Sequence, residues 1–368
     1  MKVAIVCDWL TNVGGAEKVL LEIHRLYPKA PIYTSKYSSR KINWFVDADV
    51  KTGWLQIFPA CLRRFLGPLR QRWFSHLDLS EYDLIISVTG AEAKAVRATK
   101  PGAKHISYCH VPTQYYWQMY DEYVKNPGFG ILNPFVRFFF KLLVKPLRKK
   151  DFEAAQRVDE FVTISEYAKG LIFEYYKREA TVIHPPVEIK DFRIQKIEPS
   201  SLNSYYITTS RQVNWKRLDL AVKACMRLDR ELIVVGEGPE HKRLVKIAGN
   251  SKFVKFVSLV GKNELAKYLA NARGYIFPSL EPFGIAPVEA LAAGIPVIAF
   301  GEGGALDYVI EGKNGVLFEK QTVNSLMKAI SKFEKMKFKR EDIVKSAEGF
   351  GAERFDRDLK EFINEKIV

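Results

Sequence analysis

Short runs of apolar residues alternate with stretches of helical periodicity along most of the chain. In the first half, the runs that have the length and apolar character of buried strands are residues 3–7, 84–88, 105–108, 161–164 and 181–183. Residues 16–26 instead carry apolar side chains at intervals of three and four, which predicts a helix. Buried strands that alternate with helices are typical of parallel sheets. The pattern therefore predicts an α/β fold.

The alternation lapses over residues 185–204, which are rich in proline, charge and serine, and then starts again. Such a stretch is typical of a linker. The strands expected after it are residues 205–209, 231–235, 253–259, 275–278, 296–300 and 316–318, and the helices are 218–228, 263–272 and 287–293. We therefore predict two doubly wound, Rossmann-like domains, residues 1–190 and 203–345, whose loops at the carboxyl ends of the strands face a central cleft.

Composition and charge restrict the class of protein. The 368 residues are 47% hydrophobic and 27% charged, which excludes a disordered or fibrous chain. The four cysteines are far apart, so neither a disulfide framework nor a cysteine zinc site is expected. Because residues 1–8 lack the core of a signal peptide and no stretch of about 20 residues is uniformly apolar, we expect a cytoplasmic protein.

The segment PSLEPFGIAPVEALAAGIPVIAF, residues 278–300, carries the clearest chemistry. A strand leads into a loop with Glu281 and Gly284, and a short helix is expected to begin near Pro287. The free N–H groups at a helix N-terminus suit a phosphate, and Gly284 lets a ligand approach the backbone. Glu281 before the helix and Glu289 in its first turn can contact different parts of one extended ligand. Alternatively, both carboxylates only complement the helix dipole.

This Glu-x7-Glu segment resembles that of the retaining glycosyltransferases of family four, which have the GT-B fold. The sequence GGAE at residues 14–17 resembles the N-terminal glycine loop of that family, and YCHVP at residues 108–112 resembles its histidine segment. Together with DWLTNVGGAEKVL, YCHVP is similar to bacterial mannosyltransferases of O-antigen and exopolysaccharide assembly. Residues 350–368 resemble the helix that crosses back onto the first domain in such enzymes, so the resemblance covers nearly the whole chain.

The resemblance implies a role for each matching residue. The residues implied to take part in catalysis are His110, Glu281, Arg211 and Lys216, and those implied to bind the donor are Gly14, Gly15, Arg211, Lys216, Gly284, Ile285 and Glu289. A guanidinium fork and an ammonium group suit a diphosphate whose charge grows as the sugar bond breaks. As an isolated pair, the two cations would equally fit a solvated helix start. No metal or other cofactor is expected, because the nucleotide sugar is a substrate.

The function implied is transfer of a hexose, mannose from GDP-mannose, to a lipid-linked or polysaccharide acceptor, with a UDP-sugar transferase of the same fold as the alternative. A nicotinamide oxidoreductase is disfavoured because Gly236-Glu237-Gly238 lacks the third glycine of a dinucleotide loop. A nucleic-acid-binding protein would use the net charge of +15, but the chain has no zinc finger or aromatic RNA-binding signature. A glycosidase with Glu281 and Glu289 as its two carboxylates leaves the phosphate-binding cations without a role.

Residues 51–150 hold 16 basic and 6 acidic residues, a net charge of +10. Within them, Arg137, Lys141, Lys145 and Arg148 are spaced to form one stripe of a helix that is also rich in Phe and Leu, and Pro146 is expected to kink or end that helix. Residues 58–73 repeat the mixture, with Gly67-Pro68 interrupting the helix. We expect 58–73 and 129–150 to contact anionic lipid at the inner face of the cell membrane. The alternative is that the aromatic residues are core and the cations a solvated face.

Overall fold

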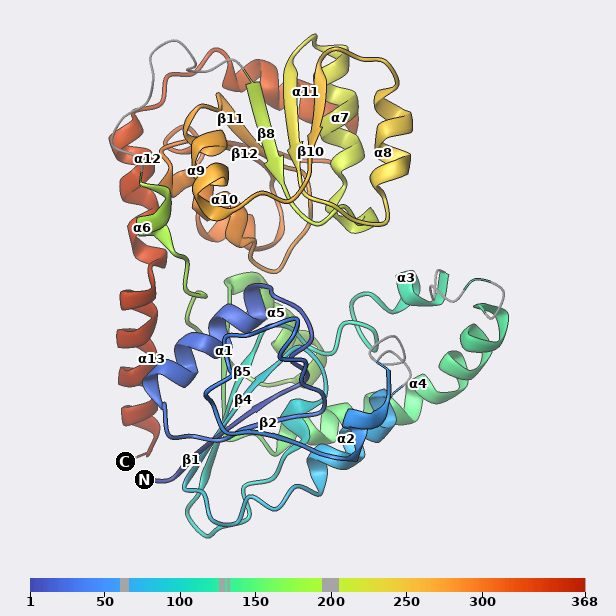
Figure 1. The fold of residues 1–368 in the computed structure, drawn as a ribbon, viewed down its shortest axis with the longest axis vertical. Coiled ribbons are helices and arrows are strands. Elements are labelled where there is room, and N and C mark those ends of the chain that lie inside the picture. The colour runs from blue at the N-terminus through green and yellow to red at the C-terminus, as the bar shows by residue number, and fades with distance from the viewer. Residues whose placement is uncertain (60–65, 126–129, 131–132, 194–204, 368) are drawn as a thin grey trace. The chain divides into compact units, whose positions relative to one another are not determined.

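The computed structural model describes residues 1–59, 66–125, 130, 133–193 and 205–367, and shows two parallel α/β sheets, as predicted (Figure 1). The chain divides into two compact units. The first unit is Met1–Pro185 with Phe355–Val368, and the second is Pro186–Arg354. The division falls where the hydrophobic pattern lapses. Of the expected linker, residues 194–204 lie outside the described part of the chain.

The first unit contains a seven-stranded sheet in the order β3-β2-β1-β4-β5-β6-β7. Its strands are β1 (Val3–Cys7), β2 (Ile32–Thr34), β3 (Val50–Thr52), β4 (Leu84–Thr89), β5 (Lys104–Cys109), β6 (Glu160–Thr163) and β7 (Thr181–Val182). All neighbours are parallel, and Ile5 of β1 pairs with Ile32 on one side and Ile86 on the other. The sequence pattern missed the three-residue strands β2 and β3, whereas it found the even shorter β7 as part of residues 181–183.

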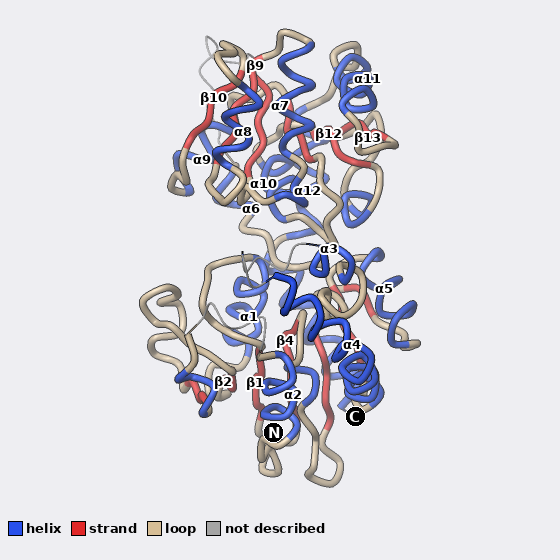
Figure 2. The backbone as a smooth tube through the Cα atoms, turned by 90° about the vertical axis from the view of Figure 1, so that its right-hand side faces the viewer, coloured by secondary structure: helices blue, strands red, loops and turns tan. Residues whose placement is uncertain are grey.

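Helices lie beside this sheet (Figure 2). They are α1 (Gly15–Leu26), α2 (Gly67–Ser75), α3 (Tyr120–Lys125), α4 (Asn133–Gln156), α5 (Glu166–Tyr176) and α13 (Ala352–Ile367), with the 3-10 turns η1 (Trp54–Ile57) and η3 (Ala93–Ala95). Helix α13 belongs to the first unit from Phe355 onward, and the Phe355 ring packs on Tyr108 of β5 at 5.8 Å. None of the described helices combines the length and apolarity that crossing a membrane requires.

The expectation that a helix ends at Pro146 was wrong. Helix α4 continues through Pro146 to Gln156, although proline cannot donate the usual backbone hydrogen bond. Val144, Leu147, Asp151, Ala154 and Ala155 are buried on one side of the helix, and we attribute the tolerance of Pro146 to this packing. Gly67 is the first residue of α2, where Pro68 sacrifices no intrahelical bond. The expected interruption of a helix at Gly67-Pro68 stays a prediction, because residues 60–65 lie outside the described part of the chain.

The second unit contains a six-stranded parallel sheet in the order β10-β9-β8-β11-β12-β13. Its strands are β8 (Tyr205–Thr209), β9 (Glu231–Val235), β10 (Val254–Val257), β11 (Gly274–Phe277), β12 (Val297–Phe300) and β13 (Gly315–Phe318). Each lies within two residues of its predicted bounds. The core between this sheet and the helices is aliphatic and aromatic, with Tyr206, Ile276 and Phe333 almost fully buried.

Helices cover both faces of the second sheet (Figure 1). One face holds α7 (Leu218–Arg227), α8 (His241–Ala248) and α11 (Val323–Phe333), and the other holds α6 (Ile189–Phe192), α9 (Lys262–Ala270), α10 (Ile285–Ala292) and α12 (Arg340–Ala347). The 3-10 turns are η6 (Asn214–Lys216), η7 (Gly303–Asp307) and η8 (Glu348–Phe350).

The strand order reverses at one point in each sheet. In the first unit the chain turns back between β1 and β4, and in the second between β8 and β11. In open α/β sheets, ligands bind at the carboxyl ends of the strands beside such a reversal. The loops that follow β1, β4, β8 and β11 are therefore where functional side chains are expected.

Candidate active site

Glu281 lies in the loop that follows β11, at the reversal point of the second sheet. The buried Ser279 hydroxyl donates to Oε1 of Glu281 at 2.7 Å, while Lys216 forms an ion pair with Oε2. Lys216 reaches this loop from η6, which follows the neighbouring strand β8. The structure thus brings together two residues that the sequence singled out separately, and both oxygens of the carboxylate are held.

The backbone of the Glu281 loop packs closely against two glycines of η7. The Gly304 N–H donates to the Glu281 carbonyl at 2.8 Å. A Cβ atom on Gly304 would lie 2.3 Å from the Pro282 carbonyl oxygen and 2.4 Å from the Phe283 Cα, so only glycine allows this approach. The neighbouring Gly303 adopts a φ of +76°. These glycines are therefore part of the support of the site.

Helix α10 begins at Ile285, two residues earlier than predicted, so Glu289 lies in its second turn rather than its first. The reason is the N-cap Gly284, whose φ of +95° turns the chain into the helix and favours glycine. Glu289 is only 8% exposed. Burial raises the pKa of the Tyr275 hydroxyl, and the nearby carboxylates of Glu281 and Glu289 raise it further. Both predicted carboxylates therefore lie near one buried tyrosine.

Arg211 is exposed in the loop directly after β8. This loop rests on the turn after β9, where a Cβ on Gly236 would lie 2.3 Å from the Ser210 carbonyl oxygen and one on Gly238 equally close to that of Gln212. The fully buried Gln212 side chain donates to the Gly236 carbonyl at 2.6 Å. This packing accounts for both glycines without a dinucleotide, and sequence reasoning missed Gln212.

His110 directly follows β5 in the first unit, as predicted. Its N–H donates to the Thr89 carbonyl at the end of β4, 2.8 Å away. Burial lowers the pKa of His110 to about 4, so the imidazole is neutral at pH 7. Its Nε2 atom is buried and has no hydrogen-bond partner among the described residues. A neutral ring with an unsatisfied nitrogen can exchange a hydrogen bond with a ligand hydroxyl.

Gly14 and Gly15 form the turn between β1 and α1. Gly14 is the N-cap of α1 in an extended conformation that other residues also adopt, and Lys18 N–H donates to its carbonyl at 3.1 Å. Gly15 is exposed. Their conformation does not require glycine, but the absence of side chains leaves the N-terminus of α1 open to a ligand.

The segment after His110 is tied down by a buried ion pair that sequence reasoning missed. Lys94 Nζ lies 2.6 Å from Asp151 Oδ1, and each side chain is 1% exposed. Asp151 also accepts hydrogen bonds from Thr113, Trp117 and Tyr176 at 2.7–2.9 Å. Burial alone would lower the pKa of Lys94, but the Asp151 carboxylate raises it above its ordinary value. The cluster therefore fixes the polypeptide three residues beyond His110.

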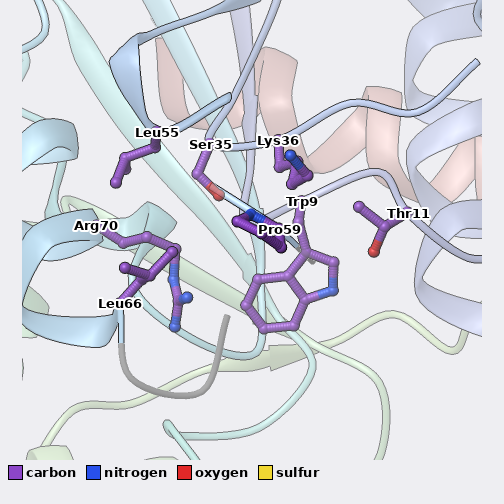
Figure 3. A pocket seen from close by; sticks show the side chains of 8 residues that line it. All are labelled: Trp9, Thr11, Ser35, Lys36, Leu55, Pro59, Leu66 and Arg70. Carbon is purple, nitrogen blue, oxygen red and sulfur yellow. The ribbon is translucent and has the colours of Figure 1, made fainter. Parts of the chain in front are cut away.

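A pocket opens at the carboxyl ends of β1 and β2 in the first unit. The side chains that line it are Trp9, Thr11, Ser35, Lys36, Leu55, Pro59, Leu66 and Arg70 (Figure 3). The Arg70 guanidinium lies 5.0 Å from the centre of the Trp9 ring and pairs with the buried Glu92 at 2.8 Å. The Lys36 ammonium donates to the Gln56 and Phe58 carbonyls, and the hollow has room for about one water molecule. The sequence pattern did not predict this hollow, and it placed Pro59, Leu66 and Arg70 in the segment 58–73 that was expected to contact lipid.

Among the described residues, no group of three or more His, Cys, Asp or Glu side chains is placed to hold a metal ion. The cysteines that the structure describes, Cys7, Cys109 and Cys225, are buried and unpaired with one another.

A comparison with protein families finds a match within the second unit. Residues 190–350 match the family model of glycosyl transferases group 1. The chain is 25% identical over 333 residues to an uncharacterised glycosyltransferase of Haemophilus influenzae, covering 87% of this chain and 86% of that protein. It is 22% identical over 384 residues to the alpha-1,3/1,6-mannosyltransferase ALG2 of Dictyostelium discoideum, covering 87% of each.

Other curated relatives match over a shorter part. The UDP-N-acetylglucosamine–peptide N-acetylglucosaminyltransferase GtfA subunit of Streptococcus parasanguinis is 26% identical over 238 residues, covering 59% of this chain and 47% of that protein. The chain spans about half the length of several such relatives.

Solved structures share the whole architecture. HepE of Anabaena in complex with UDP has a TM-score of 0.71 at 18% identity, covering 99% of this chain and 100% of that one. The lipopolysaccharide outer core galactosyltransferase WaaB in its apo form has a TM-score of 0.73 at 16% identity, covering 100% of both chains. The predicted GT-B fold is thus confirmed, and the second unit carries the sequence pattern of glycosyl transferases group 1.

Proposed function

We propose that this protein is a retaining glycosyltransferase that moves a hexose, mannose from GDP-mannose, to a lipid-linked or polysaccharide acceptor during assembly of a cell-surface glycan. The observation that carries the proposal is the Lys216–Glu281 ion pair at the reversal point of the second sheet, inside the segment that matches glycosyl transferases group 1. A cation for phosphate and a carboxylate for sugar hydroxyls lie side by side there. This is the pairing that a nucleotide sugar requires.

In the proposed reaction, Arg211 and Lys216 neutralise the donor diphosphate together with the N-terminus of α10. Glu281 accepts hydrogen bonds from hydroxyls of the sugar, and Glu289 holds the ribose. The bond between the anomeric carbon and the diphosphate breaks, and a bond to the acceptor oxygen forms on the same face. The departing phosphate takes the acceptor proton. These cations oppose the leaving-group charge, so the proposed reaction needs no metal.

His110, Gly14 and Gly15 contribute from the first unit. The neutral His110 imidazole is proposed to hydrogen-bond a hydroxyl of the donor sugar, and the open turn at Gly14-Gly15 to admit the donor.

The donor is supported by the similarity to ALG2, whose name specifies a mannosyltransferase. The alternative is a UDP-sugar donor, because HepE shares the fold and was solved with UDP. A lipid-linked acceptor would place the protein at the inner face of a membrane as a peripheral protein.

The experiment is a thermal-shift screen of GDP-mannose, UDP-glucose and the free nucleotides, followed by turnover with the nucleotide sugar that stabilises the protein. A ligand that binds only the folded state raises the melting temperature. Lys216→Met should weaken diphosphate binding roughly 10- to 150-fold, the effect of losing one charge-assisted contact of ~1.5–3 kcal/mol. Lys242→Met, at an exposed lysine of α8 in the same unit, is the matched control.

The result that overturns the proposal is an absence of stabilisation by every nucleotide sugar, or equal binding by the Lys216 and Lys242 variants. Stabilisation by UDP-glucose alone would indicate that the donor is a UDP-sugar, which is the alternative given above. A product with the inverted anomer would refute front-face transfer, and loss of turnover in chelator would refute the metal-free reaction.

A further inference from the structure

One face of α4 exposes large apolar side chains to solvent. Phe135, Phe138, Phe139, Leu142 and Leu143 are between 44% and 68% exposed. Their spacing of three and four residues places them on one side of the helix. Figure 1 shows the first half of α4 extending beyond the sheet of its own unit. Soluble proteins rarely leave such a contiguous apolar patch uncovered, so we call these five residues the apolar face and ask what covers it.

The charged residues within the first 18 residues of α4 are all of one sign. Residues 133–150 contain six Lys or Arg and no Asp or Glu. Lys141 and Lys145, one helical turn apart, are exposed beside the apolar face, and Lys149 and Lys150 are exposed beyond them. An apolar strip bordered by lysines matches the chemistry of a bilayer with anionic headgroups.

The structure also corrects the predicted basic stripe. Arg137 turns inward and donates through Nε to the Val124 carbonyl at 2.9 Å. The Arg148 guanidinium lies over the rings of Tyr120 and Trp117, at 4.7 and 5.3 Å. In the second predicted segment, Arg70 is buried in its ion pair with Glu92, and residues 60–65 lie outside the described part of the chain. The exposed cations that border the apolar face are therefore lysines of α4.

We propose that the apolar face of α4 and its bordering lysines dock onto an anionic lipid bilayer, with the helix lying in the plane of the interface. The five apolar side chains would enter the boundary between headgroups and acyl chains, while Lys141 and Lys145 reach the phosphates. A second copy of the chain fits less well, because two such faces would bring like charges together. A single-stranded nucleic acid fits less well too, because it would leave the two leucines of the apolar face without an apolar partner.

The docking face is firmly joined to the rest of its unit. The second half of α4 carries Asp151, which pairs with Lys94 and accepts a hydrogen bond from Thr113, three residues after His110. Docking would therefore fix the orientation of the first unit relative to the membrane. The inference deepens the proposed function, because a lipid-linked acceptor would lie in the same membrane, but vesicle binding is measured without donor or acceptor.

The test is co-sedimentation of the full chain with phosphatidylcholine vesicles and with mixed phosphatidylcholine–phosphatidylglycerol vesicles. We expect binding to the mixed vesicles that weakens with salt. Lys141→Glu with Lys145→Glu should lower the partition coefficient at least about 30-fold, the effect of two lysines at an anionic surface. Phe138→Ser with Leu142→Ser should lower it at least about tenfold.

The matched controls are Lys242→Glu with Lys246→Glu, two exposed lysines one turn apart on α8, and Phe173→Ser, an exposed phenylalanine on α5. These controls should bind like the unaltered protein, and circular dichroism should show that every variant is folded. Equal loss in the controls, no binding to mixed vesicles, or equal binding to pure phosphatidylcholine would overturn the proposal. The proposal would also be overturned if light scattering showed a dimer that Phe138→Ser dissociates. It would be overturned as well if single-stranded RNA displaced the vesicles from the protein.

Discussion

Replacing Asp151 with alanine tests the buried ion pair that holds the segment after His110. The variant leaves the Lys94 ammonium, which is 1% exposed, without its anionic partner. It also removes the acceptor for Thr113, Trp117 and Tyr176. The first unit should therefore lose stability, and the His110 segment should lose its anchor.

The magnitude follows from the burial of both groups. Removing one partner of a buried pair costs about 3–5 kcal/mol, because the remaining charge has neither water nor a counter-ion. With a urea dependence of ~2 kcal/mol per molar, the unfolding midpoint of the first unit should fall by about 2 M. Glu153→Ala is the matched control on the same helix, since Glu153 is exposed and lies 4.0 Å from exposed Lys149. It should cost less than about 1 kcal/mol.

The pH dependence distinguishes an unpaired lysine from a simple packing defect. In the unaltered protein the pKa of Lys94 is raised above 10.5, so its contribution is constant below that pH and is lost only as the pH rises through the folded-state pKa. In Asp151→Ala, the largest of the charges that oppose burial is lost and the Asp8 carboxylate remains, and we expect the pKa of Lys94 to fall below its unfolded value. The unfolded state then binds more protons, so the stability of the variant should rise with pH between neutral and alkaline conditions.

Urea unfolding followed by tryptophan fluorescence at several pH values measures both effects. Lys94→Met combined with Asp151→Leu should recover much of the lost stability, because it leaves no unpaired buried charge. A midpoint shift no larger than that of Glu153→Ala, or a pH-independent loss, would refute the reasoning.

Two further predictions concern the candidate site. Gly304→Ala should displace the Glu281 loop, because its Cβ would meet backbone atoms at 2.3–2.4 Å, and should lower turnover at least about tenfold in a transferase assay, whereas Gly349→Ala, with no atom within 4 Å, should not. Equal turnover of both variants would show that the loop tolerates the clash. Because burial lowers the pKa of His110 from 6.5 to about 4, the unfolded state binds more protons in that range, so stability should fall as the pH drops from 6.5 to 4. His110→Asn should remove up to ~1.4 kcal/mol per pH unit of that slope in urea titrations, and an unchanged slope would contradict the burial of a neutral His110.

Local patterns in the sequence were sufficient for the fold class. Strands of a parallel sheet are buried on both faces and therefore form continuous apolar runs, whatever their neighbours are. The strands longer than three residues were found for this reason, as was the restart of the pattern after residue 204. The three-residue strand β2 depends on pairing with β1, and β3 on pairing with β2, which no local pattern records.

The candidate site, like the fold, was predicted from the sequence only in part. Residue type and spacing singled out Glu281 and Glu289, and the resemblance to family-four glycosyltransferases added Lys216 and His110. The start of α10 was misplaced, because the positive φ of Gly284 depends on packing against Phe277 and Tyr308.

Long-range contacts decided the rest. Ser279 and Lys216 meet at Glu281 although 63 residues separate them, and Lys94 meets Asp151 across 57 residues. In the sequence, a lysine in a buried ion pair is indistinguishable from one in solvent, as Lys94 and Lys141 illustrate. Charge and hydrophobicity are properties of the residue and can be read locally. Burial and pairing are properties of the packed chain, so only the tertiary structure could assign them.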